Sequence, residues 1–175
     1  AQNWDVKTPF LLPGLPPMRR IATGYFHSLG LAMDGTVWSW GYGADGQLGQ
    51  GSASAPSKPK AIKLRNIVSI SASCRHSLAL DNQGNVWCWG DNTYGAVGNG
   101  TTIKAPVQVL SDAKAIASGV NHTLALKNDG TVWAWGHNAN GQLGDGTTQN
   151  SLTPKQVPGL TQVKAIFSGY NTCFA

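Results

Sequence analysis

Three stretches of the chain repeat one pattern of large, small and polar residues. Residues 116–144 read IASGVNHTLALKNDGTVWAWGHNANGQLG, and residues 21–49 and 70–98 repeat this pattern with substitutions. The isoleucines at 21, 70, 116 and 166 are therefore 49, 46 and 50 residues apart, a period typical of propellers and solenoids. The sequence predicts a repeat protein.

Within each copy, large and small residues alternate on both sides of a glycine-containing pair. In the third copy, Leu124-Ala125-Leu126 precedes Asp129-Gly130 and Trp133-Ala134-Trp135 follows it. Alternation with a period of two indicates strands, and the pair indicates the tight turn of a hairpin. With Asp129 and Gly130 as the two central turn residues, Leu126 is expected opposite Trp133, so that large side chains face large ones. Because both faces are apolar, we expect each hairpin to lie between neighbouring sheets.

The Trp-x-Trp pairs recur in every copy and are expected to belong to the core. These tryptophans are Trp38, Trp40, Trp87, Trp89, Trp133 and Trp135. An isoleucine-containing segment precedes each hairpin, and a proline-marked segment such as residues 105–109 follows the glycine-rich loop. Proline at its start suits an edge strand. Four short strands per copy predict an all-β fold built from propeller blades of four antiparallel strands.

The repeats also divide the chain. Residues 8–24 align without gaps to residues 153–169, so residues 1–20 are expected to be the end of a preceding repeat. The expected units after it are 21–69, 70–115, 116–165 and the start of a fourth repeat at 166–175. Three blades make an open arc, which we expect to be part of a larger propeller or to be completed by partner chains.

Composition agrees with a turn-rich β protein. Hydrophobic residues make up 41% and charged residues 12% of the chain, with 22 glycines. The net charge is +5, and the basic group at residues 58–65 is interpreted as a lysine-blunted strand edge, so nucleic acid is not favoured as a partner. The three cysteines show no zinc spacing, and no run of residues is apolar enough to span a membrane. Low charge and abundant Asn, Gly, Ser and Thr favour a secreted or surface protein.

The polar residues that recur suggest structure rather than catalysis. His27, His76 and His122 occur once per repeat, too far apart to bind one metal ion, and are expected to bond backbone at blade junctions. The Gly-x-Gly-x-x-Gly at residues 41–46 lacks its middle glycine in the other copies and is not a dinucleotide site. Neither a carboxylate pair nor a Ser-His-Asp set is indicated. We expect no catalytic residues, no metal and no cofactor, and therefore no enzyme.

The repeated motifs resemble those of one known family. Gly-x-x-His-[Ser/Thr]-Leu-x-Leu, then Asp-Gly-Thr-Val-Trp-x-Trp-Gly, then Gly-Gln-Leu-Gly is similar to the repeat of the regulator of chromosome condensation family. The resemblance implies a seven-bladed propeller of about twice this length. It also implies guanine-nucleotide exchange on a small GTPase, the activity of the family's namesake. Departures from the pattern occur at Ser73, which replaces the first glycine, and at Thr172, which replaces the histidine.

The function favoured by the sequence is a non-enzymatic interaction scaffold. The loops after the Trp-x-Trp strands vary among copies and carry side chains typical of recognition surfaces. The candidate binding residues are Tyr42, Asp45, Asn92, Tyr94, His137 and Asn140. The expected ligand is a protein, with a surface glycan as an alternative. Two other hypotheses are a guanine-nucleotide exchange factor and a subunit of a fibre or surface assembly, whose partners are copies of the chain itself.

Overall fold

The computed structural model of the chain describes residues 11–52, 54–101 and 103–175, and every regular element in these ranges is a β-strand. The expected repeat end at residues 1–20 thus lies partly outside the described residues. The first sheet contains β1 (Met18–Thr23), β2 (His27–Ala32), β3 (Val37–Gly43) and β4 (Ser54–Ala61). The second contains β5 (Ile67–Ala72), β6 (His76–Asp81), β7 (Val86–Gly90) and β8 (Ile103–Leu110). The third contains β9 (Ala113–Ser118), β10 (His122–Lys127), β11 (Val132–Gly136) and β12 (Ser151–Gln156). The short strands β13 (Phe167–Ser168) and β14 (Cys173–Phe174) form a fourth sheet.

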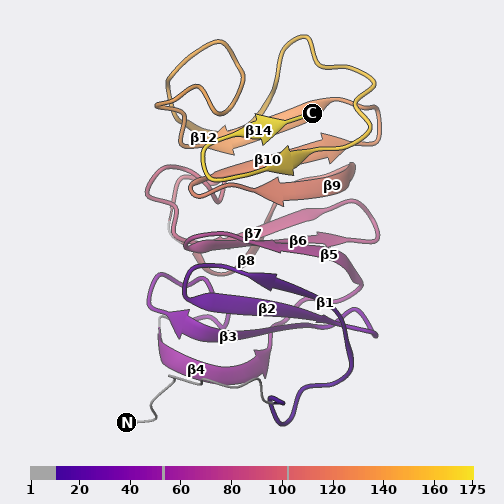
Figure 1. Cartoon of the computed structure of the whole chain (residues 1–175), viewed down its shortest axis with the longest axis vertical. Helices are drawn as coiled ribbons and strands as arrows, with labels where there is room; N and C mark the ends of the chain where they lie inside the picture. The colour runs from indigo at the N-terminus through magenta and orange to yellow at the C-terminus, as the bar shows by residue number, and fades with distance from the viewer. Residues whose placement is uncertain (1–10, 53, 102) are drawn as a thin grey trace.

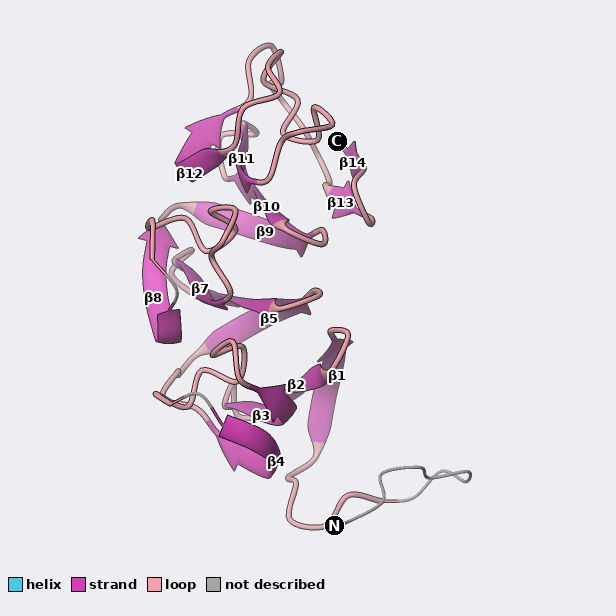
Figure 2. Cartoon of the chain, turned by 90° about the vertical axis from the view of Figure 1, so that its left-hand side faces the viewer, coloured by secondary structure: helices cyan, strands magenta, loops and turns pink. Residues whose placement is uncertain are grey.

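The sheets are stacked face to face as blades (Figure 1). All pairings within them are antiparallel, and each four-stranded sheet follows the order of the chain. The first strands of successive sheets contact one another, because β1 touches β5, β5 touches β9 and β9 touches β13. These strands form the inner side of an open arc, and β4, β8 and β12 form its outer edge (Figure 2). The prediction of an all-β arc of four-stranded blades is therefore confirmed.

The expected hairpin register was wrong by one residue. Leu126 lies opposite Val132, and Ala125 lies opposite Trp133. The cause is the turn: the Gly130 N–H donates to Lys127 O (3.1 Å), so the central turn residues are Asn128 and Asp129. Gly130 follows with φ of +83°, which gives a three-residue loop of a type I turn and a left-handed residue. Each tryptophan of the pairs therefore lies opposite a small residue, as Trp133 lies opposite Ala125 and Trp135 opposite Thr123.

The hydrophobic core is divided among the junctions between blades. One cluster joins Leu29, Leu31 and Val37 of the first sheet to Ile67 and Trp89 of the second. The two other clusters join the second sheet to the third and the third to Ile166 and Cys173 in the same way. Burying one such leucine stabilises the fold by about 1.5–3 kcal/mol. The second and third hairpins are thus packed on both faces, as expected, and Trp87, Trp89, Trp133 and Trp135 are buried or half-buried in these junctions. For the first hairpin the clusters show packing on one face, and Trp38 and Trp40 are half-buried.

Candidate functional site

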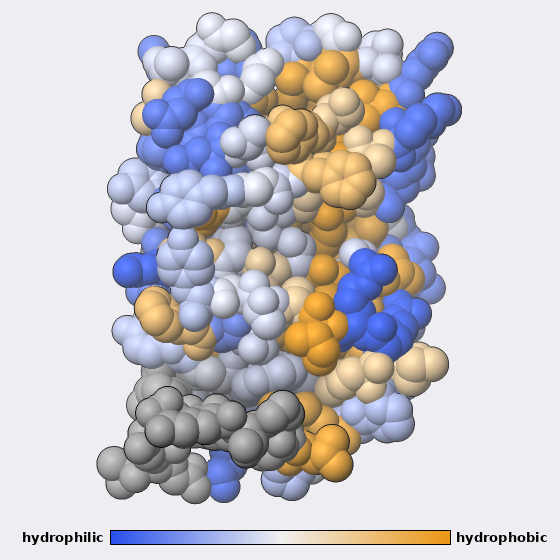
Figure 3. Space-filling model, viewed as in Figure 1, coloured by the Kyte–Doolittle hydropathy of each residue, from blue (hydrophilic) through white to orange (hydrophobic). Residues whose placement is uncertain are grey.

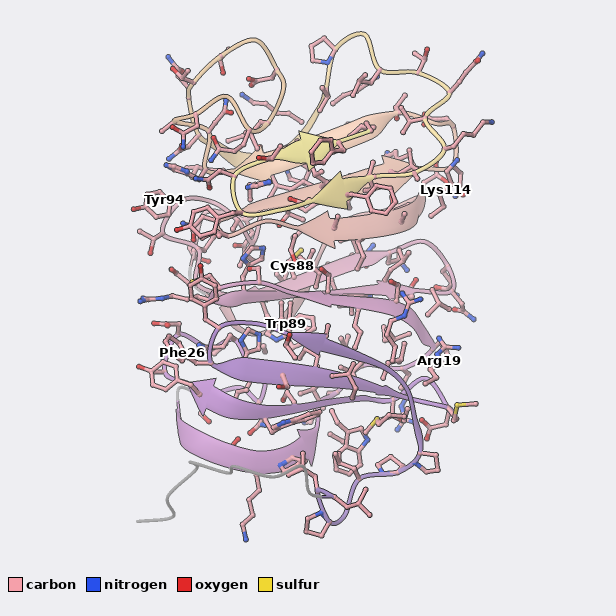
Figure 4. All side chains as sticks on the ribbon, in the orientation of Figure 1. Arg19, Phe26, Cys88, Trp89, Tyr94 and Lys114 are labelled. Carbon is pink, nitrogen blue, oxygen red and sulfur yellow. The ribbon has the colours of Figure 1, made fainter. Side chains whose placement is uncertain are left out.

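The β1–β2-type and β3–β4-type loops of all blades lie on the same side of the arc, where together they form one surface. The β1–β2 and β3–β4 loops are joined by the Tyr42 N–H, which donates to Phe26 O (2.7 Å). Asp91 and Arg75, and His137 and Asn121, make the equivalent bonds in the next two blades. We call this surface the loop end, comprising residues 24–26, 42–52, 73–75, 91–101, 119–121, 137–150 and 169–172. The opposite surface, the turn end, holds the hairpin turns and the connections between blades. Figure 4 shows Phe26 and Tyr94 on one side of the molecule and Arg19 and Lys114 on the other.

The recurring histidines lie beneath the loop end and connect one blade to the next. His27 Nε2 is 2.8 Å from the Ser77 hydroxyl, and His76 Nε2 is 3.1 Å from the Thr123 hydroxyl. Each hydroxyl donates in turn to a backbone carbonyl of the preceding blade, Gln47 O (2.9 Å) and Ala96 O (2.8 Å) respectively. The histidines thus lie at the blade junctions, as expected, but their ring nitrogens bond side-chain hydroxyls and not the expected backbone groups. A hydroxyl from the next blade stands between the imidazole and the backbone.

This arrangement determines the state of His76. Because the Thr123 hydroxyl gives its proton to a carbonyl, the Nε2 atom of His76 must be the donor in the bond between them. On the other side of the ring, the Ser73 hydroxyl is 2.7 Å from Nδ1, which a neutral imidazole offers as an acceptor. His76 is therefore neutral and bonded through both ring nitrogens.

The histidines are held uncharged by burial. Burial lowers the pKa of His27 and of His122 to about 4. Burial, and secondarily the neighbouring histidines, lowers the pKa of His76 to about 3. In the first and third copies glycine replaces Ser73, and Nδ1 of His27 and of His122 is buried without a hydrogen-bond partner. Neutral, enclosed rings of this kind stabilise the junctions and are not exposed to a substrate.

The Gly-Gln-Leu-Gly loop also has a structural role. A side chain at Gly49 would bring its Cβ within 2.8 Å of the Trp89 indole nitrogen, and Gly98 has the same relation to Trp135. The indole of Trp89 donates to Gln47 O (2.8 Å). The loop of one blade thus accepts the second tryptophan of the next, which explains why glycine ends this motif.

Asn92, predicted as a binding residue, is internal. Its side chain is 6% exposed, donates to Asn99 Oδ1 (3.1 Å) and Thr101 O (2.9 Å), and accepts from the Val97 N–H (2.7 Å). Asn138 holds the third loop in the same way. The amide of Asn92 is occupied in shaping its own loop, because short polar side chains satisfy backbone groups where no ladder does. It is therefore not a surface contact.

The other predicted residues do lie at the loop end, in three sets of contacts. Tyr94 contacts His137 edge to face with ring centroids 4.7 Å apart, and Asn140 is exposed beside them in the same loop as His137. Asp45 is half-buried and pairs with Arg75 of the next blade at 3.8 Å. Tyr42, 39% exposed, contacts Phe26 at 6.1 Å between centroids.

Sequence reasoning missed the most exposed aromatic side chains of this surface. Tyr25, Phe26 and Tyr170 are 56%, 63% and 66% exposed. Tyr25 contacts Phe26 edge to face, and partial desolvation and then the nearby Tyr170 phenol raise the pKa of Tyr25. The sequence held one sign of this surface, because the residue after the first position of the histidine motif varies among the copies. It is Tyr25, Cys74, Val120 and Tyr170 in turn.

No group of three His, Cys, Asp or Glu side chains in the described ranges is placed to hold a metal ion. Nor does any helix in those ranges have the length and apolarity needed to cross a membrane.

Known proteins with the same architecture were found by sequence and by structure. RCC1 domain-containing protein RUG3, mitochondrial, of Arabidopsis thaliana is 37% identical over 75 residues, which are 40% of this chain and 16% of that protein. Prp20p of Saccharomyces cerevisiae superposes with a TM-score of 0.80 at 23% identity, over 90% of this chain and 43% of that one. Yeast RCC1 (Prp20) bound to Kap60 gives 0.76 at 25% identity, over 83% and 38%. The chain thus spans less than half the length of each.

The repeat itself matches a defined family. The sequence pattern of the regulator of chromosome condensation (RCC1) repeat matches residues 34–80, 83–126 and 129–175, and a second pattern of that description matches 19–47, 67–96 and 113–142. These matches cover most of the chain and contain the histidine, Trp-x-Trp and glycine-loop motifs described above. The chain belongs to the family of regulator of chromosome condensation (RCC1) repeat proteins.

Proposed function

We propose that this chain is a non-enzymatic scaffold that binds a protein partner through its loop end. The observation that carries the proposal is the cluster of exposed aromatic side chains formed by Tyr25, Phe26 and Tyr42, with the exposed Tyr170 near Tyr25. Exposed aromatic groups that lie together are uncommon on a surface without a partner, and Tyr, Phe and Arg are enriched in interfaces. The loops that carry them stand on rigid blades, the arrangement that many binding proteins use.

The recurring polar residues of the repeat have structural roles, which leaves binding to the exposed loop residues. His27, His76 and His122 are buried at the junctions, and Asn92 and Asn138 bond their own loops. These residues build the frame, whereas Tyr25, Phe26 and Tyr42, which lie at loop positions that differ among copies, are exposed. A frame that is repeated and a surface that varies favour recognition over a shared chemical step.

The related structures support binding in a general way. Prp20p binds Gsp1p and histones, and yeast RCC1 binds Kap60. Those partners belong to those proteins. The likeness to Prp20p, at 23% identity, concerns the fold, and this chain covers less than half of it. For this chain the proposal is limited to a protein partner at the loop end.

A peptide library displayed on phage tests the proposal. The library is panned on the immobilised 175-residue chain, and the selected peptides are titrated against wild type, Phe26→Ser and Met33→Ser. Met33 is 67% exposed at the turn end and serves as the matched control. We expect Phe26→Ser to weaken binding about tenfold, equivalent to about 1.4 kcal/mol, and Met33→Ser to leave it unchanged. Peptides that are insensitive to Phe26→Ser, or a failure to select any, would contradict the proposal.

A further inference from the structure

The two ends of the arc differ in charge. The loop end carries three carboxylates, Asp45, Asp91 and Asp145, and one guanidinium, Arg75, a net charge of −2. The turn end carries seven cations and four carboxylates, a net charge of +3. Its cations are Arg19, Arg20, Lys63, Arg65, Lys114, Lys127 and Lys164, and its carboxylates are Asp34, Asp81, Asp112 and Asp129. Although the chain is basic as a whole, its aromatic surface is therefore acidic.

Two lysines outside the loop end lie close to it: the Gly51 N–H donates to Lys104 O (2.9 Å), and Lys155 is near enough to Asp145 for its charge to act on that carboxylate. Lys104 follows the second loop on β8, the outermost strand of its sheet. Tyr25, Phe26 and Tyr170 lie in the loops that join β1 to β2 and β13 to β14, at the inner side of the arc. The hydropathy surface shows the apolar residues of the viewed face as a band that runs across the blades, with the hydrophilic residues on either side (Figure 3).

The aromatic rings are arranged to accept a cation. Tyr25 and Phe26 meet at an interplanar angle of 88°, and Phe26 and Tyr42 at 69°. In an edge-to-face pair the edge of one ring covers one face of the other, which leaves the opposite face of that ring free of the pair, and the face is the negative side of the quadrupole. A cation above such a face is attracted to it. The chain itself contains one example, in which Lys127 Nζ lies 4.6 Å from the centre of the Trp133 ring.

Two of the carboxylates are fixed in position and keep one oxygen available. The Thr93 N–H and hydroxyl both donate to Oδ1 of Asp91 (2.9 and 2.6 Å). Thr147 and Asn138 donate to Oδ1 of Asp145 (2.8–3.1 Å). Within the ranges that the structure describes, Oδ2 of neither aspartate accepts a hydrogen bond. The bond from the Thr147 hydroxyl lowers the pKa of Asp145, so this group is ionised at neutral pH.

We propose that the loop end recognises a protein segment that presents lysine or arginine side chains, which lie against Tyr25, Phe26 and Tyr42 and pair with Asp45, Asp91 and Asp145. The proposal rests on the proposed function, because it names the partner class of the same surface. Charge selects the partner: an acidic segment would meet three carboxylates and a single guanidinium, whereas a cationic one complements both the carboxylates and the ring faces.

Synthetic peptides of one design test the charge preference. Three fluorescein-labelled Gly/Ser decapeptides, carrying four lysines, four glutamates or neither, are titrated against the full chain by fluorescence anisotropy at low ionic strength. We expect only the lysine peptide to bind, and its affinity to fall as salt shortens the screening length from about 30 Å at 0.01 M to about 10 Å at 0.1 M. Binding of the glutamate peptide as tight as that of the lysine peptide would overturn the proposal.

A pair of triple variants separates local recognition from net charge. The first is D45N/D91N/D145N at the loop end, and its matched control is D34N/D112N/D129N at the turn end. Asparagine retains an acceptor oxygen for each local bond, and both variants raise the net charge by three. We expect the loop-end variant to lower the affinity for the lysine peptide about tenfold more than its control does, because it removes the negative charges that complement the lysines. Equal effects of the two variants would overturn the proposal.

Phe26→Leu tests the contribution of the ring. Leucine keeps an apolar side chain of similar size and removes the π face, so lysine-peptide binding should weaken about two- to fivefold. Unchanged binding would remove the aromatic part of the proposal.

The remaining outcomes distinguish the two proposals. If phage-selected peptides bind the loop end regardless of their charge, the scaffold function stands and the cationic preference falls. If no peptide binds there, the failure lies with the scaffold function. Light scattering of the chain alone gives a third result: dimers that D45N/D91N/D145N abolishes would mean that the cationic turn end of a second copy occupies the surface, which overturns the proposal of a separate partner.

Discussion

The indole Nε1 of Trp89 donates a hydrogen bond of 2.8 Å to the carbonyl of Gln47 in the preceding blade. The ring reaches that carbonyl by passing over Gly49, where no side chain stands in the way. One hydrogen bond and one missing Cβ thus fix how closely two blades approach. The contact explains two motifs at once, the second tryptophan of the hairpin and the last glycine of the loop.

Gly49→Ala is expected to loosen this junction. Its Cβ would lie 2.8 Å from Trp89 Nε1, and the residue has φ of +66°, which alanine adopts at a cost. Gly51→Ala is the matched control, because Gly51 has φ of +84° but nothing within 4 Å. We expect Gly51→Ala to cost about 1–2 kcal/mol of unfolding free energy and Gly49→Ala about 1–3 kcal/mol more. Urea unfolding followed by tryptophan fluorescence measures both, and equal losses would show that Trp89 can move aside.

Thr123→Val is expected to break the bond between the second and third blades. The change removes the acceptor of His76 and the donor to Ala96 O while keeping the shape of the side chain. An unsatisfied buried polar group costs about 1–3 kcal/mol. Thr123→Ser keeps the hydroxyl, so its unfolding free energy should fall clearly less than that of Thr123→Val. Chemical denaturation of the two variants side by side gives the answer, and a valine variant as stable as the serine variant would argue against the histidine–hydroxyl bond.

The buried histidines make stability depend on pH. The pKa of His27, His76 and His122 is lowered by burial to between about 3 and about 4, whereas an unfolded histidine titrates near its ordinary value of 6.5. The unfolded chain therefore binds more protons below pH 6.5, so this stability is present above 6.5 and is lost as the pH falls towards 4. At pH 5 each histidine costs about 2 kcal/mol relative to pH 8. Unfolding free energies measured by urea across this window should fall steeply with acid, and His76→Gln should reduce the slope by about one proton. A flat profile would contradict the buried, neutral state.

Asn92→Ala and Asn140→Ala should behave differently. Asn92 makes three hydrogen bonds inside its loop, and losing them leaves the Val97 N–H buried without a partner. We expect a loss of about 1–3 kcal/mol for Asn92→Ala, and less than about 0.5 kcal/mol for the exposed Asn140→Ala. Thermal unfolding is a sufficient measurement. Equal thermal unfolding midpoints for the two variants would show that the side chain of Asn92 does not stabilise its loop.

The fold could be predicted because three copies agree in register. A single copy leaves the hairpin and its flanking segments ambiguous, but three copies place the same alternation beside the same turn, which only blades of a repeat explain. The register within the hairpin could not be predicted as safely. The sequence Asn128-Asp129-Gly130 is compatible with a two-residue Asp-Gly turn and with a three-residue loop that ends in glycine. Packing of tryptophan beside alanine selects the second.

The site was predicted less well, for reasons that the residues make clear. The partners of His27 and His76 are hydroxyls about 50 residues away, and only the stacking of blades brings them together. Asn92 was chosen because its loop varies, yet its recurrence as Asn138 in the third copy indicated a structural role. Tyr25 and Phe26 lie in the β1–β2 loop, outside the loops after the Trp-x-Trp strands from which the sequence predicts the binding residues.

The division of the core among junctions has a consequence for how such chains change in length. The first two clusters each take their residues from two neighbouring sheets, so the core lies between blades and not within one. The repeat unit of the sequence corresponds to one sheet, whereas a core lies between two sheets. The sequence repeat and the packing unit are therefore offset by half a blade. Inserting another full copy between two blades creates one more junction of a kind already present and alters none of the others. Such a chain can gain or lose blades, and with them loop-end side chains, without the invention of a new packing arrangement.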